Sequence, residues 1–340
     1  SPIKIGLLGP LTGEAASFGQ NELAGAQLAV NEFNAKGGIN GRKIEIIAED
    51  DACSSKGVSA IQKLINVDDV NAIVGPACSG SGGPALPIAQ AAGVPTVIVS
   101  ASAPHLAKIG DYIFRIYPSD AFQGNYAAEF MYNTLGKRKI GVIYVQNDWG
   151  QGIKDVFIKR FQQLGGKIVL EEGVSPEARD FKTELTKLKG NGAEALYLPV
   201  YPASGINAAK QIKELNLNIP IMGGDAFTGD EFITNEYTEG IMYSVAVVNT
   251  PDDFIARVKT VSGYENSNPN LFASLGYDAT KVILESMQKV GTDRVSVMET
   301  LKSTSYRGVS TDLIEFDQDG DLKKAEYEVK VVRNKQAVNY

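Results

Sequence analysis

Short apolar runs alternate with amphipathic stretches along the first hundred residues. The apolar runs predict strands at residues 3–8, 43–48, 72–74 and 96–99. In the stretches between them apolar residues recur at spacings of three and four, as in Leu23, Ala26, Val30 and Phe33. This spacing predicts helices at residues 21–36, 59–67 and 84–92. Such alternation is typical of a parallel sheet with helices on both faces.

The same alternation restarts near residue 120. The predicted strands of this second series are residues 140–145, 167–170, 195–198 and 220–222. Its predicted helices are residues 150–164, 181–189 and 203–215. A last stretch predicts helices at 271–290 and 295–303 and strand-like segments at 313–316 and 325–332. We therefore expect two similar α/β lobes, with ligands bound beyond the carboxyl ends of the strands.

A glycine-rich loop, residues 77–84, follows the strand at 72–74 and leads into a helix. Glycines let a ligand approach the backbone, and the amides at a helix start attract an anion. Ser79 adds a hydroxyl donor. One interpretation is a carboxylate or phosphate site, and the other is a flexible turn with good capping.

The loop after the strand at 96–99 contains Ser100 and Ser102, which supply further polar groups. Two donor-rich loops on adjacent strand ends can converge on one carboxylate without an Arg or Lys.

Asp225 follows the strand at 220–222 in the second series. A carboxylate aimed into a partly dry cleft would pair with a ligand cation. The alternative is a helix N-cap or an ordinary loop acid.

Aromatic residues also stand in or near loops after strands, namely Phe18, Trp149 and Tyr201. They would either wall an apolar pocket or serve only in packing. Asp120 lies where the second series begins, and it either caps the next helix or borders the cleft.

Composition narrows the function classes. The 340 residues suffice for about two domains. The net charge of −7 disfavours nucleic acid as a partner. The single histidine, His105, argues against a histidine-based metal site or catalytic triad, and we expect it on the surface. Nucleotide-binding fingerprints and a G-x-S-x-G elbow with partners are absent, so no cofactor, metal or catalytic activity is expected.

The two cysteines, Cys53 and Cys78, each follow a predicted strand at the same edge of one sheet. They are either a disulfide, which persists in oxidising compartments, or two buried thiols. No run of about 18 apolar residues predicts a membrane span. The chain enters a strand directly after Ser1 and Pro2, as we expect of a mature chain without its signal peptide.

The chain resembles the leucine/isoleucine/valine-type periplasmic binding proteins of ABC transporters over essentially its whole length. The segments that carry the resemblance are residues 4–13, 34–41, 50–53, 75–79, 115–124, 148–152 and 316–321. The resemblance implies two Rossmann-like lobes joined by three crossover strands. Lobe 1 would be residues 1–119 and 250–327, and lobe 2 residues 120–249 and 328–340, with the ligand in the cleft between them. It also implies a Cys53–Cys78 disulfide.

The resemblance assigns roles to the candidate residues. Ser79 and Ser102 match positions that bind the ligand carboxylate, with Ser100 and Ala101 offering backbone groups. Asp225 matches an acid that pairs with the ammonium, where relatives tend to have Glu. Phe18, Trp149 and Tyr201 match aromatic wall positions.

These roles imply an extracytoplasmic, monomeric binding protein, in the periplasm or lipid-anchored. It would close around a small amino acid and deliver it to a membrane permease. Three rivals are the same fold with another ligand (an aromatic acid, keto acid or amide), a sensor or receptor ectodomain, and an enzyme.

Overall fold

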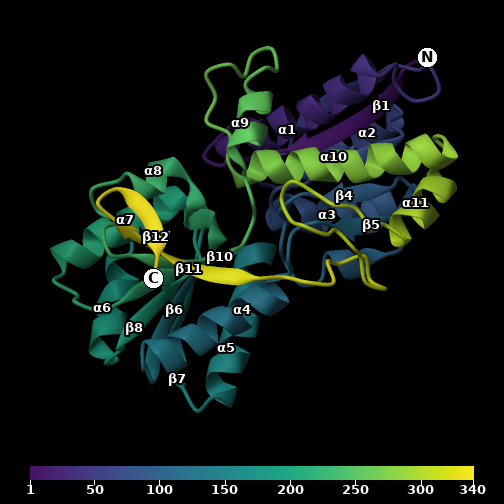
Figure 1. The fold of residues 1–340 in the computed structure, drawn as a ribbon. Coiled ribbons are helices and arrows are strands. Elements are labelled where there is room, and N and C mark those ends of the chain that lie inside the picture. The colour runs from purple at the N-terminus through teal and green to yellow at the C-terminus, as the bar shows by residue number, and fades with distance from the viewer. The chain divides into compact units, whose positions relative to one another are not determined.

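Two sheets organise the chain, one in each of two units, in a computed structural model that describes residues 1–340 (Figure 1). Unit 1 comprises Ser1–Ser119 and Val248–Ala325, and unit 2 comprises Asp120–Val247 and Glu326–Tyr340. The chain therefore passes between the units three times. Each unit is α/β, which confirms the predicted fold class.

The sheet of unit 1 has five parallel strands in the order β2-β1-β3-β4-β5. Its strands are β1 (Ile3–Gly9), β2 (Ile44–Asp50), β3 (Ala72–Val74), β4 (Thr96–Ile98) and β5 (Ile113–Arg115). The strand order reverses between β1 and β3, because the chain leaves β1 first to one side and then to the other. Such a switch point opens a crevice at the carboxyl ends of the strands, which is where α/β sheets bind ligands.

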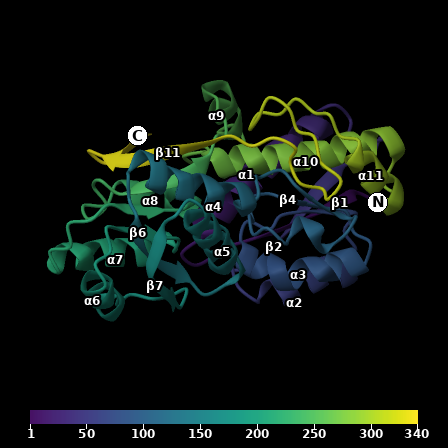
Figure 2. The same cartoon turned by 90° about the horizontal axis from the view of Figure 1, so that it is seen from below.

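Two pairs of helices cover this sheet. The helices α1 (Ala16–Ala35) and α10 (Leu271–Val290) lie on one face, and α2 (Gly57–Asn66) and α3 (Ser79–Ala91) on the other (Figure 2). Small residues let α1 and α10 approach closely, since a Cβ at Gly25 would lie 1.9 Å from the Ala273 carbonyl oxygen. Unit 1 also contains η1 (Ala107–Ile109), α9 (Asp252–Val258) and α11 (Arg294–Lys302).

The sheet of unit 2 has seven strands in the order β12-β11-β10-β9-β8-β6-β7. These are β6 (Lys139–Val145), β7 (Lys167–Val174), β8 (Ala195–Leu198), β9 (Ile221–Gly223), β10 (Met242–Ala246), β11 (Tyr327–Arg333) and β12 (Gln336–Asn339). The strands β6 to β10 are parallel, but β11 runs antiparallel to β10 and to β12. The turn between β11 and β12 has Asn334 and Lys335 at φ 51° and 60°, as two-residue hairpins require. The sequence predicted parallel sheets, so the antiparallel β11–β12 hairpin was not expected.

The helices of unit 2 again lie on both faces of their sheet. They are α4 (Asp120–Glu129), continued by the π-helical turn η2 (Phe130–Thr134), α5 (Asp148–Gln163), α6 (Lys182–Gly190), α7 (Pro202–Glu214), η3 (Asp225–Thr228) and α8 (Asp230–Ile233). The helices α4 and α5 pack tightly, since a Cβ at Gly124 would lie 2.8 Å from the Val156 side chain. None of the helices in either unit combines the length and apolarity that crossing a bilayer requires.

Three predicted elements need correction. Helix α1 begins at Ala16 rather than near residue 21, and α3 begins at Ser79 rather than Pro84, which lies inside the helix. Residues 313–316 form only isolated bridges. Their alternating apolar residues pack inward instead: Ile314 is fully buried and the Phe316 ring lies 5.2 Å from that of Phe114. The short elements β5, β10, α9 and β12 had no clear pattern in the sequence, whereas α4 is the helix that was expected at Asp120.

Candidate functional site

In unit 1 the Ser79 hydroxyl is poised to donate a hydrogen bond. Ser79 is the first residue of α3, and its Oγ accepts hydrogen bonds from the backbone amides of Ser102 (3.1 Å) and Ala103 (3.0 Å). Two accepted bonds polarise the hydroxyl and leave its own proton for another acceptor. The first-turn amides of α3 add the positive end of the helix dipole. This corner of unit 1 is therefore suited to an anion.

The loop after β4 is joined to the loop after β3 at a second point. Ser100 Oγ lies 3.1 Å from the Ala77 carbonyl oxygen and 2.9 Å from Glu22 Oε1. The amides of Ser100 and Ala101 both face the carbonyl of Pro76, at 3.5 and 3.4 Å. These two amides therefore make long hydrogen bonds within unit 1, and the role that the resemblance implies for the backbone groups of Ser100 and Ala101 stays a prediction.

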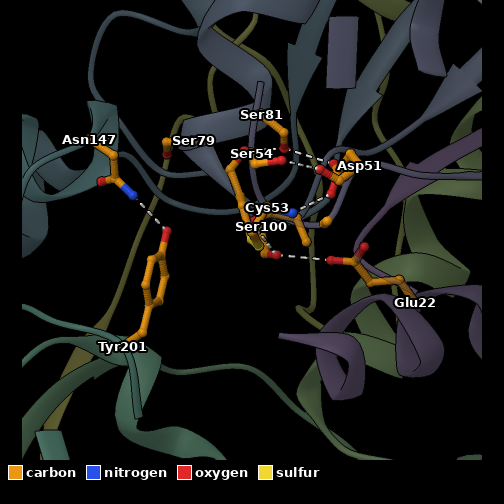
Figure 3. Close-up of a disulfide and its surroundings, with 12 residues drawn as sticks. Glu22, Asp51, Cys53, Ser54, Ser79, Ser81, Ser100, Asn147 and Tyr201 are labelled. Carbon is orange, nitrogen blue, oxygen red and sulfur yellow. Dashed lines mark hydrogen bonds between the residues drawn. A yellow bond between two sulfur atoms is a disulfide. The ribbon is translucent and has the colours of Figure 1, made fainter. Parts of the chain in front are cut away.

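Glu22 is the acid of unit 1 that sequence reasoning did not single out. It lies on α1, is fully buried and points toward Ser100 (Figure 3). Burial raises the pKa of its carboxyl well above the ordinary value, against the hydrogen bond of Ser100, which lowers it. The only signal in the sequence was a charged residue within the buried stripe of α1.

The buried side chain of Arg115 fixes the position of the 100–103 loop. Arg115 at the end of β5 is fully buried and donates to the carbonyls of Ala101 (3.2 Å) and Ala103 (2.8 Å). Its other donors reach both carboxylate oxygens of Asp321, at 2.6 and 3.0 Å. Because the Ala101 carbonyl is held on this side, the Ser102 amide of the same trans peptide points the other way, toward Ser79.

The Cys53–Cys78 disulfide is present, which confirms the predicted pairing. Asp51 anchors this region by accepting from the Cys53 amide (2.8 Å) and the Ser81 hydroxyl (2.7 Å). Burial raises the pKa of Asp51 to about 6 although both hydrogen bonds lower it.

Phe18 lies in an apolar cluster with Ala77 and Cys78 and stacks on Phe272, with ring centroids 4.5 Å apart. Phe272, at the start of α10, was not predicted, because its helix is far from Phe18 in the sequence.

In unit 2 two predicted aromatic residues form one stack. The rings of Trp149 and Tyr201 lie 5.4 Å apart at 23°. Asn147 caps α5 by accepting from the Gly150 amide, and its Nδ2 donates to the Tyr201 hydroxyl at 3.0 Å (Figure 3). Asn147 therefore orients the Tyr201 ring from the loop after β6, a role that only the contact reveals.

Two acids of unit 2, Asp225 and Asp120, lie near one buried tyrosine, Tyr197 of β8. Asp225 begins η3 directly after Gly224, where a Cβ would lie 3.2 Å from the Trp149 ring. Asp225 is half-buried, whereas Asp120, the first residue of α4, is fully buried. Burial raises the pKa of the Tyr197 hydroxyl, and the charges of Asp120 and Asp225 raise it further, so both acids lie near Tyr197. The resulting negative potential is suited to a cation.

Two further observations concern His105 and the grouping of potential metal ligands. His105 is exposed in the turn before η1, as expected of a surface histidine. No group of three or more His, Cys, Asp or Glu side chains is placed to hold a metal ion.

Two Rossmann-like units, each with polar or aromatic side chains at the carboxyl ends of its strands, define the class of two-lobed α/β solute-binding proteins. Residues 2–336 match the model of a protein family described as periplasmic binding protein, and the chain belongs to this family.

One relative is the leucine-, isoleucine-, valine-, threonine- and alanine-binding protein of Pseudomonas aeruginosa. It is 31% identical over 333 residues, covering 96% of this chain and 89% of the relative.

Two solved structures show the same fold. The branched-chain amino acid transporter substrate-binding protein of Streptococcus pneumoniae, in complex with isoleucine, has a TM-score of 0.87 at 29% identity and covers 99% of this chain and 98% of its own. A solute-binding protein of an ABC transporter from R. palustris, in complex with benzoate, has a TM-score of 0.87 at 21% identity, covering 100% and 95%.

Proposed function

We propose that this protein captures a small aliphatic amino acid outside the cytoplasm and delivers it to the permease of an ABC transporter. It would do so as a monomer and without a catalytic step. The relatives named above support the ligand class, since their descriptions name branched-chain and other small amino acids.

The observation that carries the proposal is the Ser79 hydroxyl. It accepts from two amides of the 102–103 loop, so its proton is available to a ligand carboxylate. No Lys or Arg is needed, because neutral donors and the start of α3 supply the positive potential. In the proposal Ser79 and Ser102 receive the carboxylate.

Unit 2 supplies the complementary groups. Asp225 would pair with the ligand ammonium, and the buried carboxylate of Asp120 would strengthen the negative potential there. The stacked rings of Trp149 and Tyr201, together with Phe18 of unit 1, would contact the aliphatic side chain. In this proposal the ligand favours a closed form, because closure would bring Asp225 of unit 2 to the ammonium of a ligand whose carboxylate is held at Ser79 of unit 1.

Calorimetric titration tests the proposal with leucine, isoleucine, valine and alanine. We expect at least one of them to bind the wild-type protein. Asp225→Asn should weaken that binding at least about 30-fold, because truncating one partner of a buried charge pair costs roughly 2 kcal/mol or more. The matched control is Glu236→Gln, which removes one exposed charge from the same unit. Unchanged affinity of Asp225→Asn would show that Asp225 does not bind the ammonium.

A second candidate ligand class is an aromatic carboxylic acid. The stacked Trp149–Tyr201 pair favours it, since a flat ring can lie against such a wall. Mass spectrometry of the small molecule released from freshly purified, denatured protein separates the two classes. We expect an amino acid, and recovery of a benzoate-like acid would replace it with the second class.

A further inference from the structure

The Ser100 hydroxyl lies between two oxygen atoms that both accept hydrogen bonds. Ser100 Oγ is 3.1 Å from the carbonyl oxygen of Ala77 and 2.9 Å from Glu22 Oε1. A hydroxyl has one proton, so it can donate to only one of them at a time. Both short contacts are satisfied together if Ser100 donates to Ala77 and Glu22 itself donates to Ser100.

The surroundings of Glu22 disfavour a negative charge. The side chain is fully buried, and its Oε2 has no hydrogen-bond partner. An ionised carboxylate with one bare oxygen in an apolar interior is far more costly than a neutral acid.

No cation faces Glu22 from the elements packed against α1. Lys4 of β1 donates to the Asp68 carbonyl, Arg257 of α9 pairs with Glu32, and Lys281 of α10 pairs with Glu285. Lys289 is exposed in the last turn of α10. The other charged groups of these elements are acids: Glu45, Glu49 and Asp50 of β2, Asp278 of α10, and Asp252 and Asp253 of α9. Beyond β2, Asp51 raises the pKa of Glu22 through its charge, in addition to the larger effect of burial.

We propose that Glu22 is a positioning residue that works as a neutral carboxylic acid, donating its proton to Ser100 Oγ and so directing the Ser100 hydroxyl to Ala77. This inference rests on the proposed function, because it concerns the end of unit 1 that would receive the ligand carboxylate.

The consequence is a second tie between the two loops that carry the anion site. The first tie is Ser79 with the amides of Ser102 and Ala103, and the second is Ala77 with Ser100. A neutral Glu22 maintains the hydrogen bond between Ser100 and Ala77 without adding a negative charge near the proposed anion site. An ionised Glu22 would repel the ligand carboxylate at the same point.

Infrared difference spectroscopy at pH 8 tests the proton directly. The spectrum of wild-type minus Glu22→Gln should contain the C=O stretch of a protonated carboxylic acid. The band should remain in Asp51→Asn and in the exposed control Glu45→Gln. In Ser100→Ala it should shift, because the acid loses the oxygen to which it donates. Absence of the band from the wild-type spectrum would overturn the proposal.

Titration with leucine tests the positioning role. Glu22→Gln keeps a neutral donor of the same shape, so its affinity should stay within about threefold of wild type. Glu22→Met keeps the volume but cannot donate, so its affinity should fall at least about tenfold. Wild-type affinity in Glu22→Met would overturn the positioning role. If the wild-type protein bound no amino acid, the proposed function would fail, while the infrared measurement would still decide the state of Glu22.

Discussion

The Arg115–Asp321 pair allows a sharp test of how unit 1 is built. Asp321 accepts two hydrogen bonds from Arg115, at 2.6 and 3.0 Å, and is the only acid paired with this fully buried guanidinium. Asp321→Asn removes the charge with almost no change in shape. One amide oxygen can still accept from Arg115, but the amide nitrogen then faces a second donor.

The expected destabilisation follows from these contacts. Removing one partner of a buried pair leaves an uncompensated charge and costs about 3–5 kcal/mol. Arg115 retains its bonds to the Ala101 and Ala103 carbonyls, and Asp321 is 14% exposed, so water can reach part of the site. We therefore expect the lower end of the range, about 3 kcal/mol in the free energy of unfolding.

Urea denaturation followed by far-UV circular dichroism measures this change. The matched control is Asp319→Asn, the same chemical change two residues away on an exposed side chain. The control should stay within about 0.5 kcal/mol of wild type. A loss below about 1 kcal/mol in Asp321→Asn would refute the reasoning, because that is the contribution to stability typical of an exposed ion pair.

Three further predictions concern stability. The double variant Cys53→Ser with Cys78→Ser removes the disulfide, whose cysteines have a sequence separation of 25. Loop entropy predicts a loss of about 3.5 kcal/mol in the free energy of unfolding, and equal urea midpoints of variant and wild type would contradict this. Gly25→Ala should lower the free energy of unfolding by about 2 kcal/mol or more, because the added Cβ meets the Ala273 carbonyl. The control Gly190→Ala has open space around the added Cβ and should not lower the melting temperature. Burial raises the pKa of Asp51 from 3.8 to about 6, so the folded protein binds a proton at Asp51 more tightly than the unfolded chain does. This difference adds about 3 kcal/mol to the free energy of unfolding below about pH 4, and the contribution is lost as the pH rises through 6. Asp51→Asn should therefore gain stability relative to wild type between pH 4 and 7, and parallel pH profiles in urea titrations would argue against a raised pKa.

The sequence pattern predicted the elements with strong local signals. Helix α10 has the predicted bounds because Asn270 caps its start and Gly291 follows its end at φ 80°. The start of α3 was missed because its first turns contain three glycines and a proline, residues that local rules assign to loops. Tertiary packing overrides these local preferences at the start of α3, since Gly82 fits against Pro76 and the Ser81 hydroxyl donates a hydrogen bond to Asp51.

The candidate site was predictable where it depends on strand ends and not where it depends on distant contacts. Ser79 and Asp225 were singled out because each follows a short buried strand. Glu22 and Ser100 are separated by 78 residues, and Arg115 and Asp321 by 206, so nothing local indicated that they meet. The resemblance supplied the roles of the candidate residues, and those roles stay predictions until a ligand is bound.

The most direct test of the central proposal compares leucine with two analogues that each lack one charge. The analogue 4-methylpentanoate lacks the ammonium, and 3-methylbutylamine lacks the carboxylate. If Ser79 and Ser102 bind the carboxylate and Asp225 the ammonium, calorimetry should show each analogue binding at least about 30-fold more weakly than leucine. Binding of 4-methylpentanoate as tight as that of leucine would contradict the account.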